Sequence, residues 1–222
     1  MIDDWLNHPG YEASSLKDYQ MWRGSYFVQN LLKSISQPIN FDLKFLEAGC
    51  GSAKVGIALS LIGFKNITLL DFHPNTCKSL IEFREKNSLF YKVVCERIET
   101  INGNYDYIYN EGVLEHYEDE VERLSIYKLF YDHLNYNGLI FIIVPCSDNL
   151  TREQSKLVWK NTGAPPEIYY TSSLLKKEVS SVGFRKVDLM KFKECGGDIP
   201  MLNKKIDLVG VIGHKTILGK NT

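Results

Sequence analysis

The stretch Phe45-Leu46-Glu47-Ala48-Gly49-Cys50-Gly51-Ser52-Ala53 places the tightest constraint on how this chain can fold. An apolar run ends at an acidic residue, two glycines follow, and a helix-forming run begins directly afterwards. Glycine lets the backbone turn sharply and lets a ligand approach closely, because it has no Cβ atom. A turn from a strand into a helix also directs backbone N–H groups and the positive end of the helix at whatever lies above it. The stretch therefore predicts a nucleotide-type ligand site at the end of a buried strand.

The remainder of the chain alternates between short apolar runs and amphipathic runs with brief connections. This βαβ repetition predicts a parallel, doubly wound α/β sheet. No helix fits between the last two strands, so they are expected to pair in an antiparallel manner at the sheet edge. The expected fold is a doubly wound, seven-stranded, mostly parallel sheet with an antiparallel last strand. The expected strands are 43–46, 67–70, 91–95, 105–109, 139–144, 184–192 and 205–213, and the crossover helices are 53–61, 74–87, 118–134 and 171–182.

The domain organisation follows from length. With 222 residues and 44% hydrophobic content, the chain suits one α/β domain and is short for two. A single domain over 1–222 is expected. Residues 1–40 form an N-terminal helical lid, with one helix from the capping-box motif at Ser15 to about Ile35. Residues 41–144 form the cofactor-binding half, and 171–222 hold the last helix and two strands. The irregular stretch 145–170, with a short helical piece near 153–159, is long enough to predict a substrate-binding segment.

The net charge of the chain and the spacing of its cysteines limit the kinds of partner that are expected. The formal net charge of −1 gives no general attraction to phosphate backbones, and no basic run predicts a nucleic-acid groove. The five cysteines are scattered with no metal-ligand spacing, which indicates reduced thiols and no metal site. The first ten residues do not resemble a signal peptide, and no apolar run approaches the roughly 20 residues that span a bilayer. A cytoplasmic protein without membrane or nucleic-acid partners is expected, with a homodimer as a compatible assembly.

Asp71 helps to identify the class of ligand that the glycine turn binds. A dinucleotide fingerprint requires a third glycine at position 54, where this chain has Lys54, and Gly56 comes too late for that template. Asp71 lies about 20 residues beyond the turn, at the end of the second strand, where a carboxylate can accept hydrogen bonds from ribose hydroxyls. The ligand is therefore expected to carry a ribose without being a dinucleotide.

Four segments together resemble the class I S-adenosylmethionine-dependent methyltransferases. Residues 47–52 resemble the family's acidic-x-Gly-x-Gly loop, and 70–74 resemble its acidic second-strand end. Residues 105–116 resemble its fourth-strand segment with a Leu-Glu-His triplet, and 136–141 resemble its turn into the fifth strand. The resemblance covers residues 40 to 215 and implies methyl transfer from S-adenosyl-L-methionine by in-line displacement.

The resemblance also implies roles for individual residues. Glu47 would lie near the α-ammonium of the cofactor, Asp71 would bind the ribose hydroxyls, and Glu96 would meet the adenine amine. The cofactor-binding residues it implies are Glu47, Ala48, Gly49, Gly51, Asp71, Phe72, Glu96, Arg97, Ile98, Asn110 and Glu111. His116 is the candidate general base, ahead of Tyr117 and Asp148, because it follows the fourth strand. A small, apolar or ring-bearing acceptor is expected, with walls made by Tyr19, Trp22, Tyr26, Trp159, Tyr169 and Tyr170.

Structural roles compete with several of these assignments. Glu47 could cap the following helix, and His116 could be a histidine that bridges backbone groups. Phe72 could be a core residue and Glu96 a surface residue. The whole chain could also be a non-catalytic cofactor-binding protein, a protein or RNA methyltransferase, or a nucleotide-dependent oxidoreductase, although Lys54 and the absent third glycine disfavour the last.

Overall fold

The computed structural model describes residues 8–35, 38–148, 168, 170–193, 198–199, 204–205 and 207–216. The chain divides into two compact units, residues 2–109 and residues 110–222, with Met1 grouped with the second. The predicted helical piece near 153–159 lies outside the described residues. Within the described part of the chain, no helix has both the length and the apolar character needed to cross a membrane.

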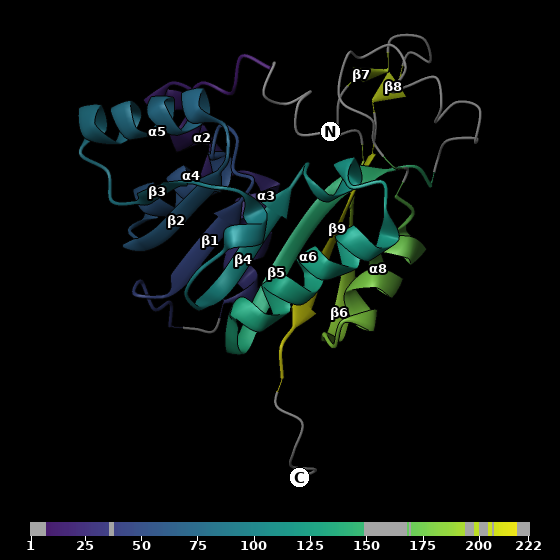
Figure 1. Ribbon diagram of the computed structural model, residues 1–222. Coiled ribbons are helices and arrows are strands. Elements are labelled where there is room, and N and C mark those ends of the chain that lie inside the picture. Colours follow the sequence, from purple (N-terminus) through teal and green to yellow (C-terminus); the bar gives the residue numbers. More distant parts are fainter. Residues whose placement is uncertain are drawn as a thin grey trace. The chain divides into compact units, whose positions relative to one another are not determined.

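The first unit is a parallel sheet with crossover helices (Figure 1). Strand β1 pairs with both β2 and β4, and β2 pairs with β3, all in parallel. The elements are β1 (Lys44–Ala48), α4 (Lys54–Ile62), β2 (Asn66–Asp71), α5 (Pro74–Asn87), β3 (Lys92–Cys95), the 3₁₀ turn η1 (Ile98–Thr100) and β4 (Tyr105–Glu111), whose last two residues begin the second unit. Apolar side chains on β1, β2 and α4 fill the core. Strands buried on both faces show little alternation of polar and apolar residues, which is the pattern of β1 and β2.

The N-terminal segment contains two helices where the sequence predicts one. Helix α2 (Leu16–Trp22) begins at a capping box in which Ser15 and Asp18 bond each other's backbone N–H, as predicted. The chain then breaks, and Ser25 caps helix α3 (Tyr26–Ser34) by accepting from the Val28 N–H. The single predicted helix is therefore wrong, because a serine N-cap after Gly24 starts a second helix within an unbroken apolar period. Both helices pack on α4.

The second unit contains the antiparallel part of the fold. Strand β9 (Asp207–His214) runs antiparallel to both β5 (Leu134–Cys146) and β6 (Arg185–Phe192), as predicted. Strand β5 begins earlier than expected, because the Asn137 N–H donates to the Lys215 carbonyl at 2.8 Å and continues the ladder instead of forming a turn. Figure 1 shows α6 (Glu120–His133) and α8 (Ser172–Ser181) next to each other in this unit, and the two helices are in contact. A short 3₁₀ turn η2 (Leu114–His116) and a separate pair, β7 (Asp198–Ile199) with β8 (Lys204–Lys205), complete it.

The seven main strands have the order β3-β2-β1-β4-β5-β9-β6. This order, with β9 as the antiparallel strand, confirms the predicted fold class. Ligands of such sheets bind beyond the carboxyl ends of the strands, next to the point where the strand order reverses. In the first unit those ends are Ala48, Asp71 and Cys95.

Candidate cofactor site

The glycine turn after β1 has an unusual backbone. Gly49 and Gly51 have φ angles of +66° and +49°, in the left-handed region that glycine adopts without strain. Ala53 also lies there, with φ +52°, and precedes helix α4 without a side-chain cap. The Cys50 N–H donates to the Leu70 carbonyl at 2.9 Å, which holds the turn against the end of β2. Burial raises the pKa of the Cys50 thiol well above its ordinary value, so Cys50 stays a neutral thiol.

Asp71 joins the glycine turn to the end of β2. Its Oδ2 accepts from the Gly51 N–H at 2.8 Å, and its Oδ1 accepts from the His73 N–H at 2.9 Å. Burial is the largest influence and raises the pKa of Asp71, while these backbone hydrogen bonds lower it by less. Each oxygen of an ionised carboxylate has two lone-pair sites, so the group can accept further hydrogen bonds from a ligand.

Glu47 lies beneath the turn and is almost fully buried. Its Oε2 accepts from the Gly56 N–H at 2.7 Å, in the first turn of α4. A Cβ atom on Gly56 would lie 2.4 Å from Leu69 and 2.7 Å from that same oxygen. Gly56 therefore allows the close approach of helix and strand that the absent third glycine would serve in a dinucleotide site. The helix-capping role of Glu47, one of the two alternatives open from sequence, is present in the structure.

A segment near the N-terminus lies over the turn. The Tyr11 N–H donates to the Thr76 hydroxyl at 2.8 Å, and its ring lies 3.3 Å from where a Cβ on Gly51 would stand. The Tyr19 hydroxyl donates to the Ser52 carbonyl at 2.6 Å. His73 bonds the His8 carbonyl through Nε2 at 2.8 Å. These contacts fix residues 8–19 against the glycine turn and the start of α5.

The other predicted cofactor residues of the first unit lie around the ends of β2 and β3. Phe72 is half-buried beside the His73 ring. The Glu96 N–H donates to the Asp71 carbonyl at 3.1 Å, so the ends of β2 and β3 are joined there. The exposed Glu96 side chain accepts from the Thr100 hydroxyl, and Arg97 pairs with Glu99 at 2.9 Å. Ile98 is buried in η1. Glu47, Ala48, Gly49, Gly51, Asp71 and Glu96 thus belong to one continuous group.

The second unit holds the residues predicted after β4. Asn110 is fully buried and Glu111 is half-buried at the carboxyl end of that strand. His116 is 6% exposed and ends η2, where its N–H donates to the Val113 carbonyl. Tyr117 follows, and its carbonyl accepts from the buried Arg123 guanidinium at 2.7 Å.

The residues predicted to line the acceptor site differ in their exposure to solvent. Tyr19 and Tyr170 are fully buried, and the Tyr170 hydroxyl donates to Glu178 at 2.8 Å. Trp22 is half-buried, stacks on Phe27 and lies under the Lys54 ammonium. Tyr26 is 57% exposed. Trp159 and Tyr169 lie outside the described residues.

Asp148, a weaker base candidate, is fully engaged in the structure. It accepts from the backbone and hydroxyl of Ser172 and from the Lys191 ammonium at 2.8 Å. Partial burial alone would raise its pKa, but the bonds from Lys191 and Ser172 together lower it to about 2. A carboxylate with so low a pKa is a poor general base near neutral pH.

Three residues of the site had not been found from sequence. Gly56 could have been found, since a glycine inside an apolar helical run often has a packing reason. Tyr11 and His73 had no such signal, because their positions depend on tertiary contacts of the 8–19 segment. Among the described residues, no group of His, Cys, Asp and Glu could hold a metal ion.

The fold and one stretch of sequence resemble the same class of protein. Residues 46–142 match the family model of the methyltransferase domain. The strand order is that of the class I S-adenosylmethionine-dependent methyltransferase fold.

Individual relatives agree with this class. The chain is 31% identical over 106 residues to the probable S-adenosyl-L-methionine-dependent methyltransferase TehB of Haemophilus influenzae, a match over 47% of this chain and 36% of that protein. It thus spans little more than a third of the length of the curated relatives it matches. The crystal structure of that TehB has a TM-score of 0.64 at 22% identity, covering 86% of this chain and 62% of the other.

Two further solved structures share the fold. An S-adenosylmethionine-dependent methyltransferase from Clostridium acetobutylicum has a TM-score of 0.66 at 14% identity, covering 90% and 93% of the two chains. A magnesium protoporphyrin IX methyltransferase from Synechocystis, with bound S-adenosylhomocysteine, has a TM-score of 0.64 at 13% identity, covering 97% and 94%.

Proposed function

We propose that this chain transfers a methyl group from S-adenosyl-L-methionine to a small acceptor. The observation that carries the proposal is Asp71: a buried carboxylate at the end of β2, bonded to the glycine turn and still able to accept hydrogen bonds. The family match of residues 46–142 and the similarity to a probable S-adenosyl-L-methionine-dependent methyltransferase support it.

The residues present suit this cofactor. Gly49 and Gly51 expose backbone without side chains, which suits an aminoacyl tail better than a charged pyrophosphate that would require a third glycine. Asp71 would accept from the two ribose hydroxyls, and Phe72 would lie against the adenine. Bound S-adenosyl-L-methionine supplies a methyl group already activated by the sulfonium.

The main task of the protein is therefore positioning. Holding a nucleophile in line can contribute several kcal/mol, with about 7–11 kcal/mol as the limit for ideal alignment. A base is required only if the nucleophile carries a proton, and we assign that role to His116. Its place in η2, directly after the β4 segment, supports this assignment.

The proposed acceptor is small and apolar or ring-bearing. Tyr19 and Tyr170 are removed from the proposed wall, because both are fully buried and hydrogen-bonded. The partly exposed ring of Tyr11, next to Gly51, takes their place in the proposed wall.

Cofactor choice is tested by thermal unfolding with S-adenosylhomocysteine or NAD. A ligand at about 100 times its Kd stabilises the native state by about 2.7 kcal/mol, so a clear rise in Tm is expected with the homocysteine compound alone. Stabilisation by NAD and none by S-adenosylhomocysteine would overturn the proposal.

Acceptor class and base are tested by transfer of labelled methyl groups. Small aromatic compounds, proteins and RNA are offered in parallel, and transfer only to proteins or RNA would sink the small-molecule assignment. His116→Gln is expected to lower kcat by roughly 10²–10⁴-fold with a proton-bearing acceptor. His133→Gln, at the end of α6, is the matched control and should retain activity.

A further inference from the structure

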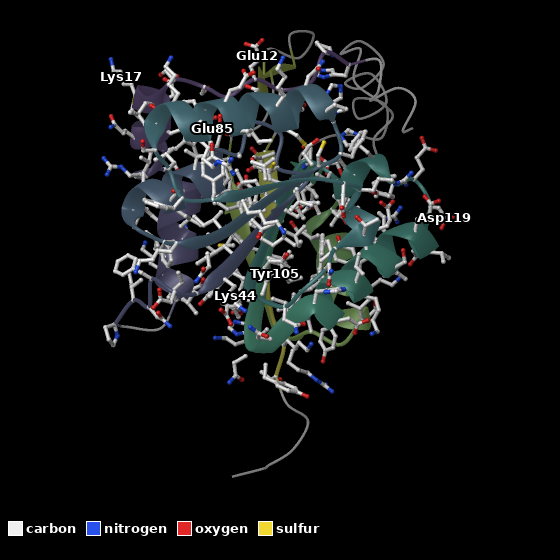
Figure 2. The ribbon with its side chains drawn as sticks, turned by 60° about the vertical axis from the view of Figure 1, so that its left-hand side comes forward. Glu12, Lys17, Lys44, Glu85, Tyr105 and Asp119 are labelled. Carbon is white, nitrogen blue, oxygen red and sulfur yellow. The ribbon has the colours of Figure 1, made fainter. Side chains whose placement is uncertain are left out.

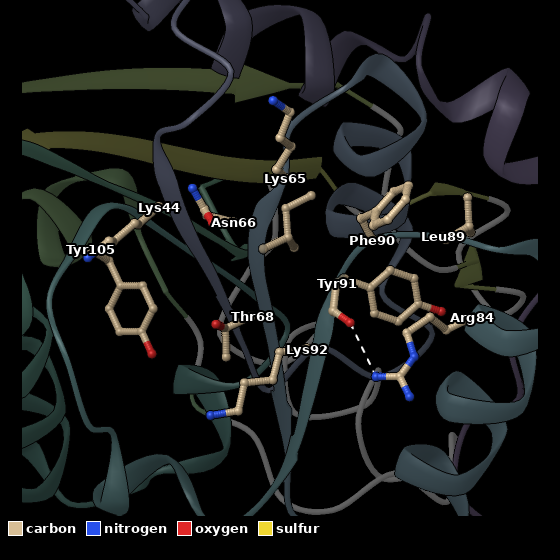
Figure 3. A pocket seen from close by; sticks show the side chains of 11 residues that line it. Lys44, Lys65, Asn66, Thr68, Arg84, Leu89, Phe90, Tyr91, Lys92 and Tyr105 are labelled. Carbon is tan, nitrogen blue, oxygen red and sulfur yellow. Dashed lines mark hydrogen bonds between the residues drawn. The ribbon is translucent and has the colours of Figure 1, made fainter.

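A recess lies at the other end of the first unit's strands, away from the glycine turn. It has a volume of about 610 Å³, and its wall includes Lys44, Lys65, Arg84 and Lys92, with Thr68 and Phe90 between them (Figure 3). No lining residue is acidic. In a protein whose formal net charge is −1, four cations around one hollow are a marked local excess.

The sheet register explains why Lys44 and Lys92, two of these cations, share a face of the sheet. Lys44 on β1 pairs with Asn66 on β2, and Lys92 on β3 pairs with Thr68 on β2. Paired residues in parallel strands point to the same face, as do residues two apart along one strand. Lys44, Asn66, Thr68 and Lys92 therefore share a face. Ile67 and Leu69 point to the opposite face, where Gly56 of α4 packs on them.

That face is open because one connection is short. Right-handed crossovers place α4 and α5 on the same face, and the reverse step from β3 to β4 would place a helix on the other. The nine residues between Cys95 and Tyr105 contain only η1. Among the described residues of the first unit, no helix follows β3 to cover Lys92 and Thr68.

Lys44 and Lys92 are available to a ligand, whereas Lys65 and Arg84 each have a carboxylate partner. Lys44 and Lys92 are exposed, and within the described part of the chain neither ammonium forms an ion pair. Three carboxylates lie near the cations: Asp42 lies 3.7 Å from Lys65, Glu85 lies 3.5 Å from Arg84, and Asp106 accepts from the Lys44 backbone N–H. Arg84 also donates to the Tyr91 carbonyl at 3.3 Å, which orients its guanidinium (Figure 3).

We infer that this hollow binds a small polyanion that carries a ring, of the class of nucleoside polyphosphates. Four cations around one hollow suit several negative charges, and the volume lies within the range of small-molecule sites. Phe90, 73% exposed at the rim, offers its ring face to a base. The site is separate from the glycine turn, because the five residue steps from Asn66 to Asp71 span about 16 Å. Figure 2 agrees, with Lys44 and Tyr105 lying well away from Glu12.

Calorimetry with ATP, inorganic triphosphate and adenosine tests the inference, each with and without saturating S-adenosylhomocysteine. ATP and triphosphate are expected to bind whether or not the homocysteine compound is present, ATP more tightly, and adenosine is not. The double variant Lys44→Ala/Lys92→Ala should weaken ATP binding by about tenfold or more, while S-adenosylhomocysteine affinity stays unchanged. The matched control Lys17→Ala/Lys33→Ala removes two exposed charges elsewhere in the unit and should bind ATP normally.

Several results would overturn it. These are no binding of ATP or triphosphate at roughly millimolar concentration, loss of ATP binding when S-adenosylhomocysteine is added, or equal losses in both double variants. Tighter binding of a single-stranded oligonucleotide than of triphosphate, at matched phosphate, would replace the small ligand with nucleic acid. None of these outcomes depends on methyl transfer, so failure here leaves the proposed function standing.

Discussion

Asp71 and Asp148 occupy similar places in the two units, yet their surroundings differ. Asp71 is the last residue of β2, and Asp148 lies two residues beyond the end of β5. Asp71 accepts from backbone N–H groups, and burial raises its pKa. Asp148 accepts from Lys191 and Ser172, and its pKa is lowered to about 2. Under the proposed function, the strand-end carboxylate held by backbone N–H groups serves a ligand, and the one held by a cation is structural.

Glu178 extends this contrast, because it is a buried carboxylate of the second unit held by Arg123 at 2.8 Å. Arg123→Met should cost about 3–5 kcal/mol, since it leaves the buried Glu178 charge uncompensated. Urea unfolding measures the loss. The control is Lys128→Met on the same helix, whose exposed pair with Asp132 is worth well under about 1 kcal/mol. Equal losses in the two variants would contradict the assignment of Glu178 as a cation-held structural group.

Asp71→Asn should weaken S-adenosylhomocysteine binding by about 1.5–3 kcal/mol, or roughly ten- to a hundredfold in Kd, through loss of charge-assisted hydrogen bonds. Calorimetry gives the value. Wild-type affinity should also fall on acidification at a higher pH than an ordinary aspartate would cause, because the folded-state pKa is raised and protonation removes the acceptor charge. A pH profile identical in wild type and variant would show that Asp71 is not the group concerned.

Asp148→Asn should reverse that pattern, with a stability loss of about 1 kcal/mol and no change in cofactor affinity. An acid with a depressed folded-state pKa stabilises the fold above its unfolded value, here 3.8, and that contribution disappears as the pH falls through about 2. The free energy of unfolding of wild type and variant, measured at pH 7 and at pH 2, tests this pH dependence. A difference in stability between wild type and variant that is just as large at pH 2 would contradict this predicted direction of the pH dependence.

Tyr19→Phe is expected to give the smallest effect. It removes the hydroxyl that donates to the Ser52 carbonyl and should cost about 0.5–1.5 kcal/mol, visible as a lower Tm. Tyr26→Phe, whose ring is largely exposed, is the control. A drop in S-adenosylhomocysteine affinity larger than the drop in stability would make Tyr19 part of the ligand site itself.

Local signals predicted most of the fold. The start and end of α5 followed from Pro74 and the apolar period, and the antiparallel last strand followed from the missing helix before it. The break at Gly24 was missed, because an apolar period cannot show that a serine starts a second helix. The glycine turn and Asp71 were found, since their spacing is local.

The residues that depend on distant contacts could not be found in this way. Tyr11 reaches Gly51 only because Thr76 and Ser79 hold the backbone of its segment. The four cations that line the basic hollow come from four separate stretches of sequence, so no run of basic residues could predict it. Tyr170 has the aromatic character of a binding wall, but Glu178 and Tyr127 hold it in the core.

Ala53 is the non-glycine residue that completes the turn in a left-handed conformation. Such a backbone costs an alanine about 1–2 kcal/mol, and a short peptide of this sequence would relax out of it. The turn is therefore shaped from outside, by the Leu70, Tyr19 and Glu47 contacts around it. The turn therefore holds backbone strain that the surrounding contacts maintain. Ala53→Gly would relieve this strain, and weakening the contacts would let the loop change conformation before the sheet unfolds.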